Sequence, residues 1–348
     1  MKSKRNGIVG AFAYGYAGLL AIYYGIRVLG GNDLGLIGLF DNFVPLALLP
    51  APLLAILGWR RRNLALMAAG VGYVATLVRS LRLKARAKQS GPMLRVLTHN
   101  VGRQLIDEDR LLRLIKDSDA ELVLLQEISE DCAARCFKAL VALYPYSAFG
   151  ALSLLDRDMG MAVMSRHPIL SNEDLKLTEE GIVVQQRVRV KLHLEALSIY
   201  NVHLTLPWIR SRRVAWFPLA LPFYDDDLRR AEVKALLDLV CAERDGVLMG
   251  GDFNLHDHSA DHARLTAVLI DAFDEAGHGW GFSWPLNSSP GINLPLAIPI
   301  VRIDYLFASK CFSAISCRLL NATGSDHRPL LVELGLRDAA YCRPSDRC

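Results

Sequence analysis

The sequence predicts an α/β domain over residues 93–337, preceded by an apolar region long enough to enter a membrane. From about Met93 onward, short aliphatic and β-branched runs alternate with helical patterns, which is typical of a mixed fold. Before that point, long apolar runs are bounded by clusters of basic residues. We therefore expect a transmembrane region over 1–80, a basic linker over 81–92, the α/β domain, and a tail over 338–348.

Charge, like hydrophobicity, differs between these regions: the N-terminal region is basic and the rest of the chain is mildly acidic. The net charge at neutral pH is +4, and 52% of the residues are hydrophobic. Residues 1–90 hold twelve Lys/Arg against Asp33 and Asp41, whereas the remainder holds 28 Lys/Arg and 34 Asp/Glu. A domain that binds a nucleic-acid backbone usually carries its own basic cluster. Nucleic acid is therefore the less favoured partner, membrane lipid is the more favoured one, and no protein partner is inferred.

Three apolar runs predict about three membrane-spanning helices, and hence a multi-pass membrane protein. Gly7–Leu29 is long enough to cross the hydrocarbon core, and Phe43–Trp59 and Leu64–Val78 follow it. A cleaved signal peptide is the alternative for the first run, but a signal peptide would not be followed by further spans. Two spans are the alternative to three, because the third run is short.

The distribution of basic residues predicts the side of the membrane on which the α/β domain lies. Both the N-terminus and Arg60–Arg62 are basic, so the positive-inside rule places them in the cytoplasm. A third span then delivers the domain to the outer face, periplasmic or extracellular. The basic residues between Arg79 and Lys88 argue against this orientation.

The seven cysteines are too few and too scattered to form a disulfide scaffold in a chain of this length. Cys342 and Cys348 are spaced to close a small loop in the tail if the domain lies in an oxidising compartment. Cys132 and Cys136 are spaced to share one face of a helix, which favours packing over a bridge.

Eight apolar runs in the α/β domain read as buried strands, and helical patterns lie between several of them. The expected strands are Leu94–Leu97, Leu122–Leu125, Met161–Met164, Val188–Leu192, Leu197–Val202, Val247–Met249, Ile303–Phe307 and Leu330–Leu334. The expected helices are Asp107–Lys116, Asp225–Cys241 and Ala260–Ala272.

Polar residues stand at the ends of these strands, where a sheet can direct side chains into a common cleft. They are Asn100, Glu127, His203, Asp252, Asn254, Asp304, Asp326 and His327. Taken singly, an Asp or Asn at a strand end is usually a turn former. A series of them at successive strand ends is harder to explain as turn chemistry, because Gly, Pro and Ser serve in many turns elsewhere.

In this arrangement the sequence resembles the endonuclease/exonuclease/phosphatase superfamily, which has the DNase I-like fold. The motifs that carry the resemblance appear in family order over about residues 93–336. They are HNVG at 99–102, LVLLQEI at 122–128, GMAVMSRHPI at 160–169, IYNVHLT at 199–205, LMGGDFN at 248–254, RIDYLF at 302–307 and GSDHRPLLVEL at 324–334. The resemblance implies two packed β-sheets with helices on their outer faces, and hydrolysis of phosphoric esters with a divalent metal.

The resemblance also implies a metal site. Asn100 and Glu127 match the family's metal-binding pair, with Glu127 as the direct carboxylate ligand, and Asp326 matches a further contributor. Mg²⁺ suits such a site because it keeps several waters and needs only one or two protein carboxylates. Mn²⁺ is the alternative ion.

The remaining roles carry over position by position in the same way. Asp252 and Asn254 match the residues that orient or deprotonate the attacking water and hold a phosphate oxygen. His327 matches the histidine that faces the scissile phosphate, and Asp304 matches its partner. His203 matches a second histidine on the phosphate side. Arg187 matches a phosphate-contacting arginine more loosely.

A second motif points to a different chemistry. The run His256-Asp-His258-Ser-Ala-Asp261-His262 is similar to the zinc motif of metallo-β-lactamase-fold hydrolases, with one residue too many before Asp261. That extra residue spoils the register, so we expect a solvated loop after the strand and no zinc site.

The composition of the segment that follows His203 bears on which substrate the protein binds. Leu206–Tyr224 interleaves aromatic residues with arginines, including Arg210, which we assign to substrate binding. An interfacial loop that inserts aromatics into lipid has this composition, and so has an ordinary packed insertion. With the anchor, the layout is similar to bacterial membrane proteins of the teicoplanin-resistance type. We therefore expect a phosphate mono- or diester of a lipid or lipid-linked substrate, with an endo- or exonuclease as the alternative and an inactive scaffold as a third.

Overall fold

The computed structural model describes most of the chain, and the gaps fall in the linker, the tail and several connecting loops. The described residues are 2–29, 38, 40–83, 93–102, 107–150, 152–153, 159–192, 195–213, 220–286, 298–321 and 323–336. The chain divides into two compact units. The helical unit comprises Met1–Leu81 and Ile209–Tyr224, and the α/β unit comprises Arg82–Trp208 and Asp225–Cys348.

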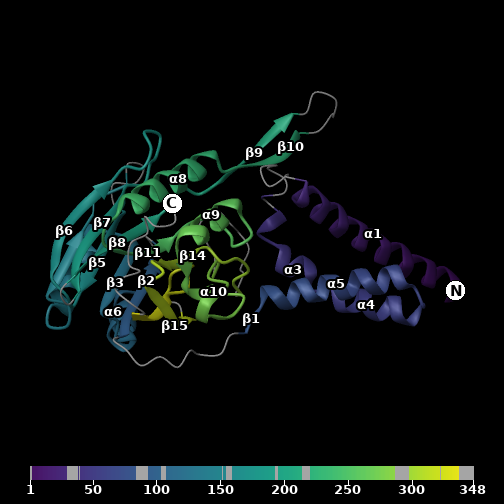
Figure 1. The fold of residues 1–348 in the computed structure, drawn as a ribbon, viewed down its shortest axis with the longest axis horizontal. Helices are drawn as coiled ribbons and strands as arrows, with labels where there is room; N and C mark the ends of the chain where they lie inside the picture. Colours follow the sequence, from purple (N-terminus) through teal and green to yellow (C-terminus); the bar gives the residue numbers. More distant parts are fainter. Residues whose placement is uncertain are drawn as a thin grey trace. The chain divides into compact units, whose positions relative to one another are not determined.

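The N-terminal part of the helical unit is built from apolar helices (Figure 1). These are α1 Lys2–Val28, α3 Val44–Leu48, α4 Ala51–Arg60 and α5 Leu64–Ser80. Among the described residues, one helix, Gly7–Val28, is long and apolar enough to cross a membrane, whereas the apolar stretches Val44–Arg60 and Leu64–Ser80 are shorter. The structure therefore supports one spanning helix by length and composition, and the expected second and third spans stay a prediction.

Helices α4 and α5 form a tight antiparallel hairpin. A side chain at Gly58 would collide with the backbone of Met67, and one at Gly70 with the backbone of Ala55, so both glycines are needed for this close approach. Asn63 begins α5 by accepting a hydrogen bond from the Leu66 N–H. The two helices therefore behave as one element.

Helix α1 contacts this hairpin along its length. Tyr73 of α5 donates a hydrogen bond to the carbonyl of Ala17, at 2.9 Å. The side chain of Asn63, at the turn of the hairpin, contacts the Tyr14 hydroxyl. In the last turn of α1, Arg27 forms an ion pair with buried Asp41, at 2.6 Å. The basic turn Arg60–Arg62 therefore lies toward the N-terminal end of α1.

The segment after His203, expected to be a loop, forms a two-stranded ribbon. Its strands are β9 Trp208–Arg213 and β10 Ala220–Asp225. Residues 209–224 cluster with the helices and not with the α/β unit from which the ribbon leaves. The ring of Tyr224 occupies the space that a side chain at Gly38 would need. The ribbon is therefore part of the helical unit.

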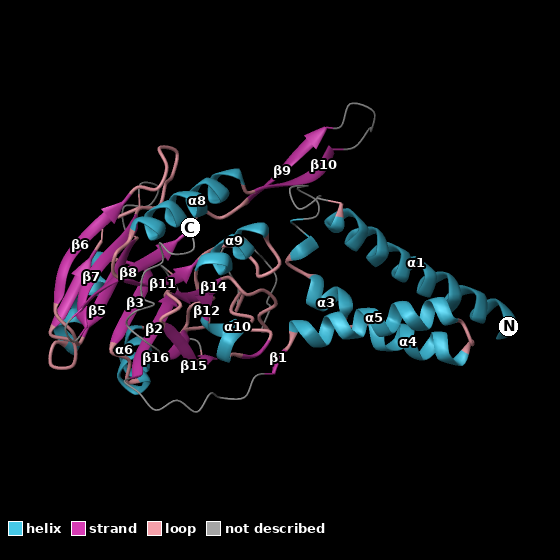
Figure 2. Cartoon of the chain, viewed as in Figure 1, coloured by secondary structure: helices cyan, strands magenta, loops and turns pink. Residues whose placement is uncertain are grey.

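Two six-stranded mixed sheets form the α/β unit (Figure 2). The first has the order β15-β16-β2-β3-β5-β4, with β2 Met93–Asn100, β3 Leu122–Ile128, β4 Tyr146–Phe149, β5 Gly160–Ser165, β15 Phe312–Leu319 and β16 Leu330–Leu336. The second has the order β12-β14-β11-β8-β7-β6, with β6 Ile169–Leu175, β7 Gln185–Leu192, β8 Glu195–His203, β11 Gly246–Asp252, β12 Ile270–Asp271 and β14 Asp304–Ala308.

The sheets pack face to face, and helices cover their outer faces. Inward residues of both sheets, such as Leu124 and Leu248, share one apolar cluster. Helices α6 Glu108–Ser118 and α7 Glu130–Leu140 pack on the first sheet, and α8 Asp227–Ala242 and α9 Ala260–Val268 pack on the second. A short helix, α10 Ala272–Ala276, follows β12. The predicted α/β fold of two sheets flanked by helices is confirmed.

A buried amide network bridges the two sheets inside this apolar core. The side-chain nitrogen of Asn201, on β8, donates to the carbonyls of Leu125 and Ala162 on the opposite sheet, at 3.1 and 3.2 Å. Gln126 donates to the amide oxygen of Asn201 at 2.7 Å. Because buried amides must be satisfied, these contacts favour one alignment of the sheets.

Several elements differ from their sequence-based expectation. The expected helix Ala260–Ala272 ends at Val268, because Ile270–Asp271 forms strand β12 against β14. The start of the basic linker is a strand, β1 Arg82–Leu83, which pairs with β13 His278–Gly279. Residues 84–92 of the linker and the tail lie outside the described residues.

Candidate active site

The site lies where the carboxyl ends of strands from both sheets meet. Strands β2 and β3 run parallel and end at Asn100 and Ile128, and β8 and β11 run parallel and end at His203 and Asp252. Asp304 begins β14 directly opposite Asp252. Parallel neighbours present their carboxyl ends at one edge of a sheet, so residues far apart in sequence become neighbours.

Glu127 reaches the site through a break in its strand. Its φ angle is 55°, in the left-handed region that side chains rarely adopt, and the pairing of β3 with β5 shifts register between Gln126 and Ile128. A bulge of this kind re-aims a side chain that would otherwise follow the alternation of the strand. The carboxylate of Glu127 therefore turns toward Asn100.

A second special backbone position precedes Asp252. Gly251 has a φ of 145°, and a side chain there would collide with the carbonyl of Val202 on the neighbouring strand. Only glycine allows this approach, which brings the ends of β8 and β11 together. His203 and Asp252 are Cα partners as a result.

The amide of Asn100 holds two carboxylates close to each other. Its nitrogen donates to Glu127 Oε1 at 2.9 Å and to Asp252 Oδ2 at 3.1 Å. His203 Nε2 lies 3.5 Å from Glu127 Oε1 and 3.8 Å from Asp252 Oδ2. Glu127, His203 and Asp252 thus present ligand atoms that all lie within 4.8 Å of one another.

His327 stands between two carboxylates on the other side of Asp252. Its Nδ1 contacts Asp304 Oδ2 at 2.9 Å, and its Nε2 lies 3.7 Å from Asp252 Oδ2. Burial disfavours the imidazolium, but the carboxylates of Asp304 and Asp252 outweigh this effect and raise the pKa of His327 to about 10. Burial is also the largest influence on Asp252, and it raises the pKa of that carboxyl group.

The loops that carry these side chains are held by hydrogen bonds that the sequence analysis missed. Gln185 clamps the backbone of His203, accepting from its N–H at 2.6 Å and donating to its carbonyl at 2.8 Å. Ser283 accepts from the Asp304 N–H, and Ser325 accepts from the His327 N–H. Ser and Gln carry little pattern in a single sequence, so no local signal identifies them.

Asp326 and Asn254 lie beside the cluster with different partners. Asp326 Oδ2 accepts from the indole nitrogen of Trp284 at 3.0 Å, and Asp326 belongs to neither metal-sized carboxylate–histidine group of this site. Asn254, with a φ of 48°, donates to the carbonyl of Leu204 at 2.8 Å. Asn254 therefore ties the loop after β11 to the loop after β8.

One of the two predicted substrate arginines, Arg187, is held away from the cluster. Arg187 pairs with Glu243 at 2.6 Å and with Glu173 at 3.1 Å, and its guanidinium lies over the ring of Tyr200. Because Tyr200 belongs to the apolar cluster beneath α8, Arg187 lies on the outer face of its sheet, and its assignment to a phosphate is corrected. Arg210 is on β9, and its side chain lies outside the described residues.

The donor set of the cluster fits a hard divalent cation. The carboxylates of Glu127 and Asp252 come from different sheets and lie within reach of one ion. Both accept hydrogen bonds from the neutral amide of Asn100, so no basic side chain is needed to hold them together. Oxygen donors of this kind suit Mg²⁺ or Mn²⁺. Glu127 is therefore the residue that would hold the metal, and the amide of Asn100 keeps Asp252 beside it.

The histidine-rich segment after Asn254 is structural. His256 and His262 are buried, which corrects the expectation of a solvated loop. His262 contacts Asp271 at 2.8 Å, and the guanidinium of Arg302 lies against Asp271 and Asp274. A cation therefore already occupies the acidic group that would otherwise attract a metal.

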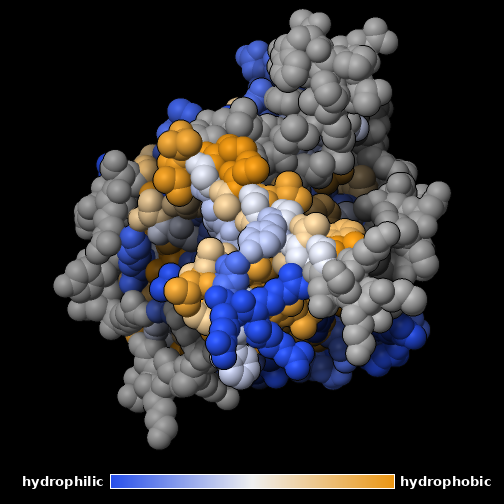
Figure 3. Space-filling model, turned by 90° about the vertical axis from the view of Figure 1, so that its right-hand side faces the viewer, coloured by the Kyte–Doolittle hydropathy of each residue, from blue (hydrophilic) through white to orange (hydrophobic). Residues whose placement is uncertain are grey.

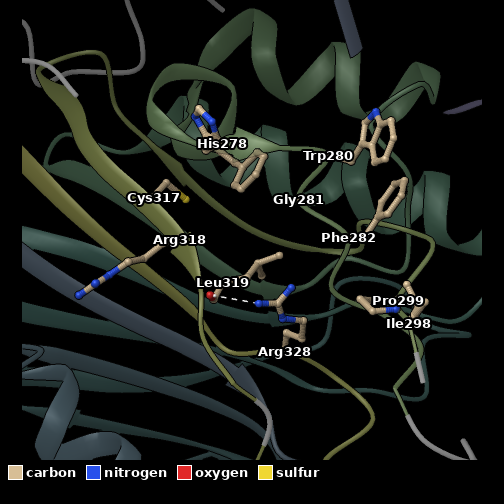
Figure 4. A pocket seen from close by; sticks show the side chains of 11 residues that line it. His278, Trp280, Gly281, Phe282, Ile298, Pro299, Cys317, Arg318, Leu319 and Arg328 are labelled. Carbon is tan, nitrogen blue, oxygen red and sulfur yellow. Dashed lines mark hydrogen bonds between the residues drawn. The ribbon is translucent and has the colours of Figure 1, made fainter. Parts of the chain in front are cut away.

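A separate cavity of about 410 Å³ lies behind the segment that supplies Ser283 and Trp284 (Figure 4). Trp280 and Phe282 stack on its wall, with ring centroids 5.4 Å apart. Arg328, the residue after His327, lines it and donates to the carbonyl of Leu319 at 3.3 Å. Trp284 donates to Asp326 in the site, whereas Trp280, Phe282 and Ile298 line this cavity. Residues 287–297 of that segment are not described.

Comparison with known proteins identifies the class of enzyme. The sequence profile of the Endonuclease/Exonuclease/phosphatase family matches residues 97–327, about two-thirds of the chain. This chain therefore belongs to that family, whose members are metal-dependent phosphoester hydrolases. A search of curated proteins finds no match to the sequence.

Solved structures share the fold at low sequence identity. An endonuclease/exonuclease/phosphatase from Beutenbergia cavernae aligns with a TM-score of 0.54 at 20% identity, over 71% of this chain and 72% of that one. A family protein from Leptotrichia buccalis aligns with a TM-score of 0.54 at 18% identity, over 70% and 100%. D. rerio TDP2, complexed with single-strand DNA product, aligns with a TM-score of 0.51 at 16% identity, over 70% and 99%.

The contact between Asp304 and His327 predicts a measurable change in titration. In Asp304→Asn, the pKa of His327 should fall by about 1–3 units, because burial is then opposed by fewer negative charges. Histidine NMR signals followed against pH measure this. Because the folded-state pKa of His327 is raised, its stabilising contribution is complete below its unfolded pKa and is lost as pH rises through about 10. The stability difference between the two proteins should shrink over that range.

The matched control for this titration is Asp274→Asn, which removes a carboxylate that does not face His327. That variant should leave the His327 titration in place. An unchanged titration in Asp304→Asn would show that Asp304 does not set the charge of the imidazole.

Proposed function

We propose that this protein is a membrane-anchored, Mg²⁺-dependent phosphoesterase that hydrolyses a phosphate mono- or diester of a lipid or lipid-linked substrate. The observation that carries the lipid assignment is the ribbon β9–β10. It leaves the site three residues after Thr205 and belongs to the same compact unit as the apolar helices. A soluble nuclease has no need of such an arrangement.

Each polar side chain of the site has a role in the proposed ester hydrolysis. Asp252, whose pKa is raised by burial, accepts a proton from the attacking water, and Asn254 holds the loop that presents it. His327, kept protonated by Asp304, lies beside Asp252 and supplies positive charge to a phosphate oxygen. His203 contributes from the opposite side of the carboxylate pair. A bound divalent ion adds Lewis acidity at the ester.

Membrane anchoring is supported by the surface of the apolar helices. Large hydrophobic side chains such as Phe12, Leu19, Trp59 and Leu64 are each more than 70% exposed. The space-filling view of this side shows hydrophobic surface next to a cluster of hydrophilic side chains (Figure 3). Contiguous exposed apolar surface marks a membrane or protein contact. Lipid accounts for it here because α1 has spanning length.

The hairpin α4–α5 bears on which side of the membrane holds the α/β unit. Because its helices pack as one element, either both cross the membrane or neither does. With α1 crossing, the number of crossings is odd in both cases, so an N-terminus in the cytoplasm places the α/β unit outside. Cys241 and Cys311 of that unit are disulfide-bonded, which agrees with an oxidising outer compartment.

The nuclease alternative is favoured by one comparison. D. rerio TDP2, which shares the fold, was solved with a single-strand DNA product. Substrate panels must therefore include DNA beside polyprenyl phosphates and phospholipids. Hydrolysis of DNA in preference to lipid would replace the lipid proposal while leaving the metal chemistry in place.

Metal dependence is the first prediction. Glu127→Ala should abolish Mg²⁺-stimulated hydrolysis of a soluble chromogenic phosphodiester, because the carboxylate that would hold the ion is removed. Asp252→Asn should lower turnover by about 10²-fold or more. The control Glu130→Ala, in the solvated first turn of α7, should behave as wild type. Full activity of Glu127→Ala, or of wild type in excess chelator, would exclude the mechanism.

The base of the ribbon provides the second prediction. Leu206 and Trp208 follow His203 closely and are 58% and 55% exposed. Replacing both with Ser should lower turnover of a vesicle-embedded phosphoester about tenfold or more, since a buried large side chain contributes about 1.5–3 kcal/mol to insertion. Turnover of a short soluble ester should not change. The control Leu170→Ser alters an equally exposed leucine on β6.

Equal losses on the vesicle-embedded and the soluble ester would show that these side chains support the fold of the site. No loss on either would show that they do not meet lipid.

Topology is the third prediction. A thiol introduced by Lys234→Cys, on the exposed face of α8, should react in intact cells with a maleimide that cannot cross membranes. Cys241 and Cys311 should become reactive only after reduction. Labelling of the introduced thiol only after permeabilisation would place the α/β unit in the cytoplasm.

A further inference from the structure

Helix α8 carries two fully buried ionic side chains one helical turn apart. Arg229 is 1% exposed and Glu232 is 0% exposed. Burying a charge is costly unless it is paired and hydrogen-bonded, so their partners show what they are for. Each of them has a partner in a loop that carries the site, Thr205 for Glu232 and Asn254 for Arg229.

Glu232 holds the loop after His203. Its two carboxylate oxygens accept from the backbone N–H of Thr205 at 2.8 Å and from the Thr205 hydroxyl at 2.7 Å. Thr205 is two residues from His203, whose backbone Gln185 clamps on the other side. The position of His203 is therefore set by β7 and by α8 together.

Arg229 holds the loop after Asp252. It donates to the carbonyl of Asn254 at 2.5 Å and to Asp226 Oδ2 at 2.7 Å. Asn254 in turn donates to the carbonyl of Leu204 and, through its N–H, to Asp252 Oδ1. Helix α8 and the two loops thus form a closed ring of hydrogen bonds.

The ribbon is joined covalently to this ring at both ends. Strand β9 begins at Trp208, three residues after Thr205, and β10 ends at Asp225, one residue before Asp226 (Figure 1). The Thr205 contact of Glu232 therefore lies close in sequence to the start of the ribbon, and the Asp226 contact of Arg229 lies close to its end.

We propose that Arg229 and Glu232 are positioning residues that hold the two loops of the site in their reactive arrangement and transmit the position of the ribbon β9–β10 to them. This rests on the proposed phosphoester hydrolysis but not on a lipid substrate. Neither residue touches the substrate, so each acts on kcat through His203, Asp252 and Asn254.

The first test separates positioning from stability with a soluble phosphodiester and the full-length chain. Glu232→Leu should lower kcat at least about tenfold with KM unchanged. Glu232→Gln should keep kcat within about threefold, because its amide can accept from the Thr205 N–H and donate to the hydroxyl. The control Lys234→Ala, which breaks an exposed ion pair with Asp238, should behave as wild type. Activities are expressed per folded molecule, measured by circular dichroism.

A purely structural role predicts a lower melting temperature with unchanged kcat per folded molecule, and that result would overturn the proposal. Should Glu232→Leu fail to fold, Thr205→Val removes one of the same hydrogen bonds with an isosteric side chain and should lower kcat in the same direction. A wild type without activity toward any phosphoester refutes the proposed function instead, so the two failures are distinguishable.

The second test addresses transmission from the ribbon. A Gly-Gly insertion between Asp225 and Asp226 slackens the junction of β10 with α8 and should lower kcat on the soluble ester by itself. In Arg229→Met, the same insertion should have a smaller effect, because the contact of Arg229 with Asp226 and Asn254 is already broken. Additive effects, or an insertion without effect in the wild type, would show that the ribbon does not act through α8.

Discussion

The site depends on buried amides that join two sheets. Asn100, on one sheet, donates to Glu127 beside it and to Asp252 on the other sheet. Deeper in the sandwich, Asn201 donates to carbonyls of the opposite sheet. Apolar packing alone tolerates small shifts between sheets, whereas buried amides are satisfied in one alignment only. The separation of the two carboxylates, and hence the fit to one cation, follows from that alignment.

Charge in the site is arranged in alternating layers. The imidazole of His327 lies between the carboxylates of Asp304 and Asp252, and Asp252 lies within 4 Å of His203. The carboxylates of Asp304 and Asp252 stabilise the imidazolium of His327, which is how this buried cleft holds a positive group near neutral pH. The acidic group near His262 has the same composition but is neutralised by Arg302, and it therefore has a structural role.

The ribbon β9–β10 and the site are connected through a short piece of chain. The ribbon leaves from the loop after His203 and returns into α8, whose buried Arg229 and Glu232 contact both loops of the site. In the proposed function, binding energy gained by the ribbon at a membrane would reach the site through this piece of chain. This gives a physical reason for placing the insertion after His203 and not at the far edge of the sheets.

The sequence by itself determined the family, the two-sheet fold and the identity of the polar residues at the strand ends, because these depend on local periodicity and on short motifs such as GDFN and SDHRP. It did not determine which of them meet. Three features join segments that are distant in sequence. They are the β-bulge at Glu127 in the pairing of β3 with β5, the ion pair of Arg187 with Glu243, and the hydrogen bond that Glu232 accepts from Thr205. Only tertiary packing decides these contacts, since burial selects partners by position in space, not by spacing along the chain.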